Sequence, residues 1–313
     1  MHAIRIHDQG GPEVLRYEEA PRPKAGKGEL LIRVHAAGVN PLDLNERHDQ
    51  LTKPFQRKFP RIPGSDLSGV VEKIGPRVSQ FKKGDAVFSN PDASRDGAYA
   101  EYVVVRESEV AHKPRTLHHV YAAAVPLAGL TAWQGLFDIA HLKRGQRLLV
   151  LGGASGVGHV AVQLARWKGA YVIATASANN QQLLRDLGVD QPVDHAKQRF
   201  ETVIKDIDVV LDTIGGDTQH RSWKVLKKAG VLVSTVQPPD SDKAKKAGVR
   251  GLFVSCQPDG KQLTAIAALI DSGKIKVIVD RILPLSEARR AHELSQSDDV
   301  RGRIVLRVKE IQL

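Results

Sequence analysis

Three glycines near the middle of the chain have the spacing of a nucleotide-binding turn. The segment Leu148–Gly158 reads LLVLGGASGVG, which gives Gly153-x-x-Gly156-x-Gly158. A diphosphate can bind the free N–H groups at a helix N-terminus only where no Cβ blocks its approach, and small residues there also let the helix pack closely on a sheet. We interpret the segment as a dinucleotide site. The alternative is a tight strand-to-helix turn that binds no ligand.

The residues after the next predicted strand indicate which dinucleotide is bound. A site that prefers NAD usually has Asp or Glu at this point, where it binds the ribose 2′-hydroxyl. This chain has Thr175-Ala-Ser-Ala-Asn-Asn-Gln instead, with no carboxylate to repel a 2′-phosphate. Ser177, Asn179 and Asn180 can donate hydrogen bonds to such a phosphate, which favours NADPH. A polar loop without contact to the cofactor is the alternative.

The elements that must position this turn alternate between strand and helix. The apolar strand Arg147–Leu151 precedes it, and apolar residues from Val157 to Ala165 then recur with helical spacing. Strands that alternate with helices of this length predict a parallel sheet with right-handed crossovers. The further strands predicted are Tyr171–Ala176, Asp208–Asp212, Val231–Val236 and residues 249–256, and the further helices are Gln181–Leu187 and His220–Lys228.

The first 120 residues have a different pattern, in which glycine and proline separate short strands. Leu30–Ala36 alternates apolar and polar residues as a half-buried strand does. These features predict a β-rich, barrel-like unit. The other strands expected there are Ser68–Ile74, Asp85–Phe88 and Tyr99–Val105, and the chain ends with helices near Lys261–Ser272 and Ser286–Ser295 and the strand Arg303–Val308.

Length and composition limit the class of protein. With 313 residues, and about 100–200 residues per domain, the chain is long enough for two domains. An apolar fraction of 42% and a charged fraction of 26% exclude wholesale disorder. No secretory signal is present, and the most apolar stretches are too interrupted for a span of roughly 20 residues. We therefore expect a soluble protein that does not bind membranes.

Cysteine content and charge say something about location and partners. Cys256 is the single cysteine, which excludes an intrachain disulfide and a multi-cysteine zinc site and suits the reducing cytoplasm. The net charge of +11 is spread along the chain, without the aromatic ladder or motif of a nucleic-acid-binding protein. A solvated basic surface, or attraction to an anionic cofactor, explains this charge without nucleic acid.

Segments spread over nearly the whole chain match the motifs of one family in order and spacing. They are Ala37-Gly-Val-Asn40-Pro-Leu-Asp43, Pro63-Gly-Ser-Asp66-Leu-Ser-Gly-Val-Val, Gly84-Asp85-Ala-Val, Gly97-Ala-Tyr99-Ala-Glu-Tyr102, Gly129-Leu-Thr131-Ala-Trp133, the glycine turn with His159-Val-Ala-Val-Gln163-Leu-Ala, Leu211-Asp-Thr-Ile-Gly215-Gly216 and Arg301-Gly-Arg303-Ile-Val-Leu. The chain thereby resembles the medium-chain dehydrogenase/reductase superfamily. The branch it resembles most is that of the zinc-free, zeta-crystallin-like quinone oxidoreductases.

The resemblance implies an α/β fold with two domains. A GroES-like, β-rich catalytic domain would comprise residues 1–122 and 261–313, and a doubly wound Rossmann dinucleotide-binding domain would comprise residues 123–260. Members of the family are commonly homodimers or homotetramers. The resemblance implies that Gly251–Cys256 is an edge strand that pairs across the dimer.

The resemblance also implies roles for single residues. Asn40 would face the nicotinamide and the substrate, Asp43 would lie behind it and Thr131 would contact the cofactor, so these three are the predicted catalytic residues. The predicted cofactor-binding residues are Thr131, Ala154, Ser155, Gly156, Val157, Gly158, Ser177, Asn179, Asn180, His195, Ile214, Val236, Phe253, Val254 and Arg303.

Four of these residues have a plainer interpretation. Asn40 suits a turn before Pro41, and Thr131 suits a helix N-cap. Arg303 could be a solvated arginine on an edge strand, and His195 a surface histidine.

The sequence predicts no metal. Zinc-bearing relatives have a cysteine within the segment that reads Gly38-Val-Asn40 here, and a His-Glu pair in place of Ser65-Asp66. A catalytic zinc needs about three protein ligands, and without such a Lewis acid a simple ketone is hard to polarise. An enone or quinone spreads the charge left by hydride addition onto a distant oxygen, where hydrogen bonds can stabilise it. We therefore predict a zinc-independent, NADPH-dependent oxidoreductase that transfers hydride to a quinone or an α,β-unsaturated carbonyl such as an enone or alkenal.

Two departures from the family bear on this prediction. Many relatives have Lys or Arg after the second strand to bind the 2′-phosphate, where this chain has Asn179-Asn180-Gln181. Some quinone reductases of this type have a tyrosine where this chain has Asn45, which puts quinone as the physiological substrate in doubt.

The alternatives are an NADPH-binding, zeta-crystallin-like protein of low turnover that binds RNA or a protein partner, and an enoyl-thioester reductase. The proton donor stays open between Tyr99, another side chain and water.

Overall fold

The computed structural model describes residues 1–48, 59–296 and 300–309, which form two compact units. The first unit comprises Met1–Leu127, Gln257–Asp271 and Val277–Leu313, and the second comprises Ala128–Cys256 and Ser272–Lys276. The boundaries expected from the sequence, after residues 122 and 260, lie a few residues away. Ser272–Lys276 joins the second unit because the Gln163 amide donates to the Lys276 carbonyl (2.9 Å) and accepts its N–H (2.7 Å).

The first unit is built around one sheet and a two-stranded ribbon. The sheet has the order β14-β15-β3-β4-β5-β7, and β6 also pairs with β3. Its long strand β3 buries Leu30, Ile32 and Val34, as the alternation in the sequence predicts. The strands are β1 (His2–Arg5), β2 (Arg16–Glu19), β3 (Glu29–Val39), β4 (Asp66–Ile74), β5 (Ala86–Ser89), β6 (Tyr102–Arg106), β7 (Val110–His112), β14 (Val279–Pro284) and β15 (Arg303–Arg307).

Short helices cover this sheet. They are α1 (Pro41–Arg47), α2 (His119–Ala122), α9 (Gly260–Asp271) and α10 (Ala288–Ser295), with the 3₁₀ turns η1 (Pro12–Val14), η2 (Glu107–Glu109) and η5 (Leu285–Glu287).

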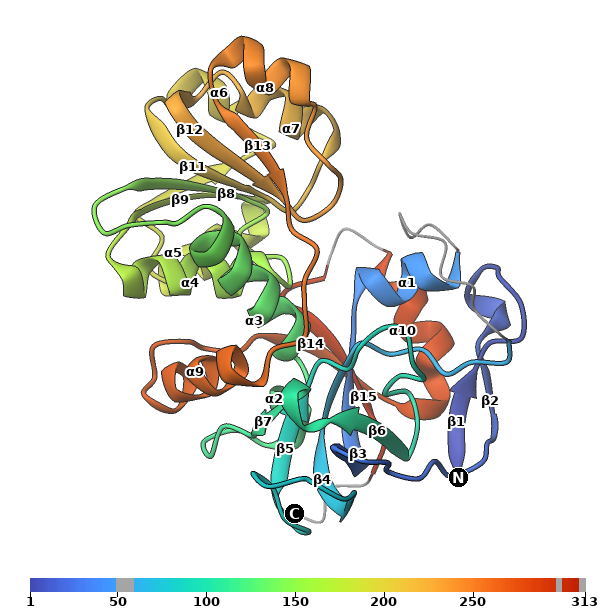
Figure 1. The fold of residues 1–313 in the computed structure, drawn as a ribbon. Helices are drawn as coiled ribbons and strands as arrows, with labels where there is room; N and C mark the ends of the chain where they lie inside the picture. Colours follow the sequence, from blue (N-terminus) through green and yellow to red (C-terminus); the bar gives the residue numbers. More distant parts are fainter. Residues whose placement is uncertain (49–58, 297–299, 310–313) are drawn as a thin grey trace. The chain divides into compact units, whose positions relative to one another are not determined.

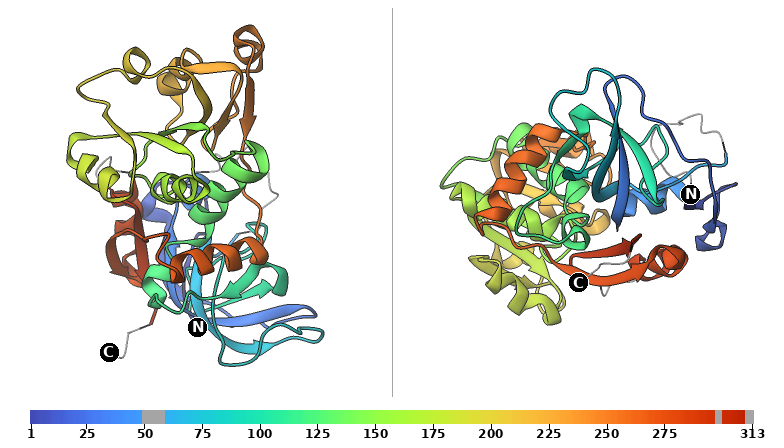
Figure 2. Two further views of the ribbon diagram at one scale, coloured as in Figure 1. Left: turned by 90° about the vertical axis from the view of Figure 1, so that its left-hand side faces the viewer. Right: turned by 90° about the horizontal axis from the view of Figure 1, so that it is seen from below.

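The C-terminal strand of the chain pairs with an early one. Strand β15 runs antiparallel to β3, with Ile304 opposite Val39, so the red end of the chain lies beside the blue strand in Figures 1 and 2. This register brings Arg303 next to Asn40, which directly follows β3. Two residues from opposite ends of the sequence thus meet in one place.

The second unit is a doubly wound parallel sheet. Its strands have the order β10-β9-β8-β11-β12-β13, and every pair is parallel. Figure 1 shows helices on both sides of the sheet, with α4 and α5 on one side and α6, α7 and α8 on the other. The strands are β8 (Arg147–Leu151), β9 (Tyr171–Ala176), β10 (Gln191–Asp194), β11 (Ile207–Asp212), β12 (Leu226–Ser234) and β13 (Arg250–Phe253).

Of the helices of this part, α4, α5 and α7 correspond to predicted helices, whereas α6 and α8 were not predicted. The helices are α4 (Gly158–Lys168), α5 (Gln181–Asp186), α6 (Phe200–Val203), α7 (Gly216–Ser222) and α8 (Ser241–Ala247), with the 3₁₀ turn η4 (Ala178–Asn180) after β9. The helix α3 (Pro126–Trp133) begins at the boundary between the units and continues into the π-helical turn η3 (Gln134–Ile139). The GroES-like domain with a Rossmann-type sheet is therefore confirmed as the fold class.

One predicted helix was wrong in its bounds. The sequence pattern places it at His220–Lys228, whereas α7 ends at Ser222 and β12 begins at Leu226. Leu226 pairs with Ile207 of β11, so pairing within the sheet overrides a local pattern that is equally compatible with a helix.

One stretch of the chain resembles a membrane span by length and composition. It is His119–Ile139, with a mean hydropathy of 1.3 in its most apolar window, and 83% of that window is buried in the protein. Core helices of globular proteins meet the same criteria, so this stretch alone is weak evidence for a span.

Candidate active site and cofactor site

The glycine turn follows β8 directly and is held by the end of β9. Gly152 has a left-handed φ of +78°, which favours glycine, and its N–H donates to Thr175 Oγ1 at 3.1 Å. A Cβ on Gly158, the first residue of α4, would come within 2.0 Å of the Gly152 carbonyl oxygen. The third glycine of the predicted triplet is thus required by the close packing of α4 on the turn. Gly152 lies outside the triplet, and the sequence analysis missed its role.

The N-terminus of α4 presents unpaired amides. Ser155 Oγ accepts the N–H of Gly158 at 3.0 Å and lies 3.2 Å from Thr213 Oγ1, so this side chain caps the helix. The N–H groups of Gly156 and Val157 have no hydrogen-bond acceptor among the described residues, and both residues are partly exposed. Amides of this kind, at the positive end of a helix dipole, fit a diphosphate.

The carboxyl ends of β9 and β10 lie side by side and are followed by four of the predicted cofactor residues, Ser177, Asn179, Asn180 and His195. Ser177 Oγ accepts a hydrogen bond from Asn180 Nδ2 at 3.1 Å, which leaves the Ser177 hydroxyl proton free to donate. The His195 N–H donates to the carbonyl of Ala176 at 3.2 Å, so His195 sits next to the end of β9. The side chains of His195 and Asn179 are exposed. This edge has hydroxyl, amide and imidazole groups, and no carboxylate at the end of β9.

A cation that the sequence analysis missed lies in the same edge. The segment after β9 has no lysine or arginine that could bind a 2′-phosphate, but Lys197 follows the neighbouring strand β10. Its side chain is 79% exposed and its Nζ lies 3.9 Å from the Asp194 carboxylate. The signal that could have found it is the parallel order of the two strands, which brings both following loops to one edge.

Two large apolar side chains are exposed at the carboxyl ends of β11 and β12. Ile214 is 52% exposed and Val236 is 50% exposed, and Ile214 reaches over Gly152, whose added Cβ would meet its Cδ1 at 2.8 Å. The buried Asp212 carboxylate holds this loop by accepting the N–H of Gly215 at 2.8 Å. These exposed apolar groups fit the predicted contact with a nicotinamide ring and ribose.

The remaining predicted residues of the second unit are more buried. Phe253 is partly buried at the end of β13, and Val254 is only 4% exposed and hydrogen-bonds through its N–H to Ser234. Thr131 is 6% exposed and lies inside α3. Its interpretation as a helix N-cap is therefore wrong.

Asn40 is completely buried at the junction of β3 and α1. It is the N-cap of α1, and its N–H donates to Asp43 Oδ2 at 2.9 Å. Its side-chain Nδ2 donates to Asp66 Oδ2 at 3.0 Å and lies 3.4 Å from the Gly38 carbonyl. These two acceptors fix the amide orientation. Asn40 Oδ1 is buried and has no hydrogen-bond donor among the described residues.

Asp66 and Arg303 form a buried ion pair beside Asn40. Arg303 Nη2 lies 3.1 Å from Asp66 Oδ2, and Asp66 Oδ1 accepts the Leu127 N–H at 2.6 Å. Burial raises the pKa of Asp66 to about 7, although Arg303 and the hydrogen bonds oppose this shift. Arg303 is only 4% exposed, so the interpretation as a solvated edge arginine is wrong.

Asp43 is a second buried carboxylate, directly behind Asn40. It accepts hydrogen bonds from Ser65 Oγ and from Tyr99 Oη, the latter at 2.9 Å. Burial raises the pKa of Asp43, and burial with the nearby carboxylate raises the pKa of Tyr99 well above its usual value. Tyr99 is one of the open candidates for the proton donor. Its O–H donates a hydrogen bond to Asp43 in this structure.

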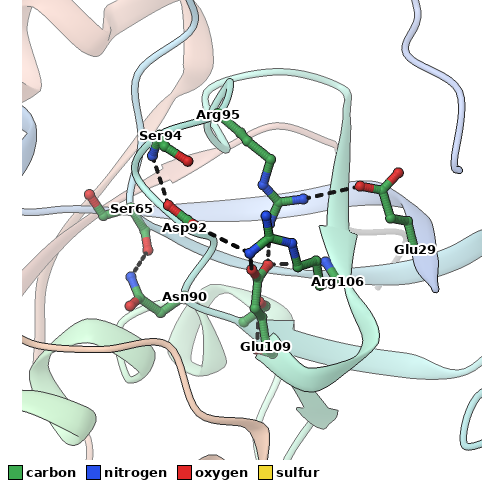
Figure 3. Close-up of polar contacts among 9 residues, drawn as sticks. Glu29, Ser65, Asn90, Asp92, Ser94, Arg95, Arg106 and Glu109 are labelled. Carbon is green, nitrogen blue, oxygen red and sulfur yellow. Dashed lines mark hydrogen bonds and ion pairs between the residues drawn. The ribbon is translucent and has the colours of Figure 1, made fainter. Parts of the chain in front are cut away.

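Ser65 is fixed by a neighbouring loop, shown in Figure 3. Asn90 Nδ2 donates to the Ser65 carbonyl. The loop that carries Asn90 is tied to strands β3 and β6 and turn η2 by a cluster of ion pairs. Its members are Glu29, Asp92, Arg95, Arg106 and Glu109. These contacts fix the backbone of Ser65, whose hydroxyl donates to Asp43.

The donor set around Asn40 does not fit a zinc ion. In the described part of the chain, no group of three or more His, Cys, Asp and Glu side chains could hold a metal ion. Asp66 stands where zinc-bearing relatives have the second residue of a His-Glu pair. Its carboxylate accepts from the Arg303 guanidinium and from two N–H donors.

Comparison with known proteins agrees with this fold. Residues 26–115 match the family model of the alcohol dehydrogenase GroES-like domain, and residues 187–306 match the model named zinc-binding dehydrogenase. The mitochondrial NAD(P)H oxidoreductase RTN4IP1 of Danio rerio is 31% identical over 100% of this chain and 92% of its own length. The chain belongs to the medium-chain dehydrogenase/reductase superfamily.

Further relatives place the chain in the quinone oxidoreductase branch of this superfamily. The NADPH-dependent alkenal/one oxidoreductase of Arabidopsis thaliana chloroplasts is 34% identical over 98% of this chain and 79% of its own length. The solved structure of the quinone oxidoreductase from Coxiella burnetii matches with a TM-score of 0.92 and 35% identity, and covers 99% of both chains. These relatives support a general NAD(P)H oxidoreductase function for the chain.

Proposed function

We propose that the protein is a zinc-independent, NADPH-dependent reductase of quinones or α,β-unsaturated carbonyls. The observation that carries the proposal is the set of contacts around Asp66. The Asp66 carboxylate accepts from Arg303, the Asn40 amide and a backbone N–H, so three of its roughly four acceptor sites are occupied. The positive charge of Arg303 also opposes a metal cation in the same place. Chemistry that needs no Lewis acid is the kind this site supports.

The choice of NADPH over NADH rests on the edge formed by β9 and β10. The absence of a carboxylate at the end of β9 removes the group that binds the 2′-hydroxyl of NADH and repels the phosphate of NADPH. Ser177 can donate a hydrogen bond there, and Lys197 adds a positive charge to the same edge. The name of the NADPH-dependent relative from Arabidopsis agrees with this choice.

In this proposal the bound NADPH supplies the hydride. The chain binds and orients the coenzyme and the acceptor, and it excludes water from them. The amides of Gly156 and Val157 would hold the diphosphate, and Ile214 and Val236 would cover the nicotinamide ribose and ring. Asn40 would offer Oδ1 to a ligand N–H or O–H. Because Asp66 holds its Nδ2 group, Asn40 is set as an acceptor and does not supply the donor that an enolate oxygen requires.

We also propose a dimer formed through β13. This strand is the edge of the six-stranded sheet, so its outer hydrogen-bonding groups are free to pair with a second copy. Sedimentation equilibrium tests this, because a monomer at micromolar concentration would contradict it.

The function is tested with purified protein whose zinc content has been measured. NADPH and NADH oxidation would be followed with 1,2- and 1,4-quinones, enones, alkenals and an enoyl-CoA. We expect turnover of one conjugated acceptor class, with NADPH preferred and chelators without effect. The variant Asn40→Ala should lose turnover and keep NADPH affinity, whereas Gln80→Ala, an exposed change in the same unit, is the control. Stoichiometric zinc together with chelator-sensitive turnover of plain alcohols would contradict the proposal.

A further inference from the structure

Arg47 is a buried arginine without a carboxylate partner. It is 0% exposed, and no carboxylate of the described residues lies within ion-pair distance of it. Its Nη1 lies 3.3 Å from His292 Nδ1, and its Nη2 lies 2.7 Å from His48 Nε2. A guanidinium has only donors, so both of these imidazole nitrogens must accept. His292 is therefore neutral, with its tautomer fixed by Arg47.

The tautomer of His292 gives its hydrogen bonds one direction. Because Nδ1 accepts from Arg47, the proton is on Nε2, which lies 3.2 Å from Tyr99 Oη and donates to it. Tyr99 in turn donates its O–H to Asp43 Oδ2 at 2.9 Å. Burial, with the nearby Arg47 charge, lowers the pKa of His292 to about 3, which agrees with a neutral ring.

The chain of hydrogen bonds thus runs from a cation to an anion. It begins at Arg47, which can only donate, and ends at Asp43, which when ionised can only accept. Arg47, Tyr99, Asp43 and His292 are each 0% exposed. Because solvent does not reach these groups, each depends on hydrogen bonds within the protein, and Tyr99 and His292 link the two ends. Glu13 and Glu293 also act on Arg47 through space, and Arg303 acts on Asp43.

The end of this chain is the N-cap of α1. Asp43 holds the Asn40 N–H through the same Oδ2 atom that accepts from Tyr99. The backbone of Asn40, and with it the position of the unpartnered Oδ1, therefore depends on Asp43 staying ionised and oriented. Helix α10, which carries His292, is thereby connected to Asn40. His292 and Arg47, which meet in this network, are 245 residues apart in the sequence.

We propose that Arg47 and His292 are positioning residues, which hold Asp43 through Tyr99 so that Asn40 keeps its acceptor aligned for the ligand. The proposal rests on the reductase function above. It differs from a purely structural role of a buried polar cluster, which would alter stability and leave the catalytic rate of the folded enzyme unchanged.

The test compares two substitutions of His292. His292→Gln keeps one acceptor and one donor in the chain, whereas His292→Leu keeps neither. We expect His292→Leu to lower kcat about 10-fold or more on the acceptor that the wild type reduces, because displacement of a positioning group by about 1 Å can cost 100-fold. His292→Gln should restore kcat to within about 3-fold of wild type. The Kd for NADPH should change less than 2-fold in both variants.

A matched control and a second variant separate this role from folding. His119→Leu removes a half-buried histidine of the same unit, which contacts Ser68 and has no hydrogen bond to Asn40 among the described residues, and should leave kcat unchanged. Tyr99→Phe deletes a single hydroxyl from the chain and serves if His292→Leu does not fold; it should lower kcat as His292→Leu does. Equal kcat in wild type and His292→Leu, or in wild type and Tyr99→Phe, overturns the inference.

The tautomer supplies a readout other than activity. Long-range ¹H–¹⁵N correlations at neutral pH should show His292 with a bare Nδ1 and a protonated Nε2. An imidazolium, or the opposite tautomer, overturns the inference while the reductase function stands. If the wild type reduces no acceptor at all, the proposed function itself is wrong and the inference falls with it.

Discussion

Placing a carboxylate at residue 177 should reverse the coenzyme preference. Ser177 directly follows β9, is partly exposed and contacts only Asn180 through its side chain. It is also the N-cap of the short turn η4, a position where Asp and Asn are as favourable as Ser. Ser177→Asp should therefore fold normally and change chiefly the charge that faces the ribose.

The magnitude follows from two opposite effects. Two unit charges about 4 Å apart repel by roughly 1 kcal/mol in water and roughly 4 kcal/mol at an effective dielectric constant of 20, and a phosphate monoester carries about −1.5 to −2 charges. A hydrogen bond from the ribose hydroxyl of NADH to the new carboxylate contributes about 1.5–3 kcal/mol. Because Ser177 is partly exposed, the repulsion lies near its lower limit, about 1.5–2 kcal/mol for this phosphate charge. Together with the hydrogen bond, about 3–5 kcal/mol shifts the preference for NADPH over NADH by roughly 10²-fold to a few thousand-fold, since about 1.4 kcal/mol is tenfold.

The assay is the Kd of each coenzyme by titration calorimetry, which needs no knowledge of the acceptor. Ser177→Asn, which has nearly the same shape as Ser177→Asp and no charge, is the matched control and should leave the ratio within about 3-fold of wild type. A Ser177→Asp protein that folds and keeps the wild-type ratio would refute the reasoning, because residue 177 would then lie away from the 2′ position.

Three further predictions concern the turn, the buried ion pair and acid stability. Gly158→Ala should weaken NADPH binding at least 10-fold in titration calorimetry, whereas Val157→Ala, in the same turn, keeps the backbone amide and the affinity. Arg303→Met should lower unfolding free energy by about 3–5 kcal/mol in denaturant titrations, and adding Asp66→Asn should recover most of it. His119 has a pKa lowered by burial to about 3 in the folded protein, so the unfolded chain takes up its proton first as pH falls. His119 should therefore lower stability by about 1 kcal/mol per unit as pH falls from about 6.5 toward 3, somewhat below the full 1.4 because the ring is partly exposed. The difference between wild type and His119→Gln in denaturant titrations over this range isolates this contribution from those of His292, His35 and Asp66, whose pKa values are also shifted.

The parts of the site that the sequence predicts best are those made by short segments. The glycine turn is a local arrangement of strand, turn and helix, and its spacing alone indicates a dinucleotide. The edge after β9 is equally local, so the missing carboxylate and Ser177 are visible in the sequence. The single residue missed there, Lys197, belongs to the next strand and requires the strand order.

The contacts around Asn40 could not be predicted from spacing. Asp66 and Arg303 are 237 residues apart and meet only because β15 pairs with β3 in one register. A shift of that register by one residue would turn Arg303 to the other face of the sheet. The resemblance indicates that Asn40 matters, but which of its amide atoms is free follows only from the position of the Asp66 carboxylate.

The most direct test of the account follows the hydride. NADPH carrying deuterium at the transferred position of nicotinamide C4 would be used to reduce an enone with protein that has been dialysed against chelator. The account predicts deuterium at the β-carbon of the saturated product, at an undiminished rate and with zinc absent from the protein. A product without deuterium, or a rate that returns only when zinc is added, would contradict it.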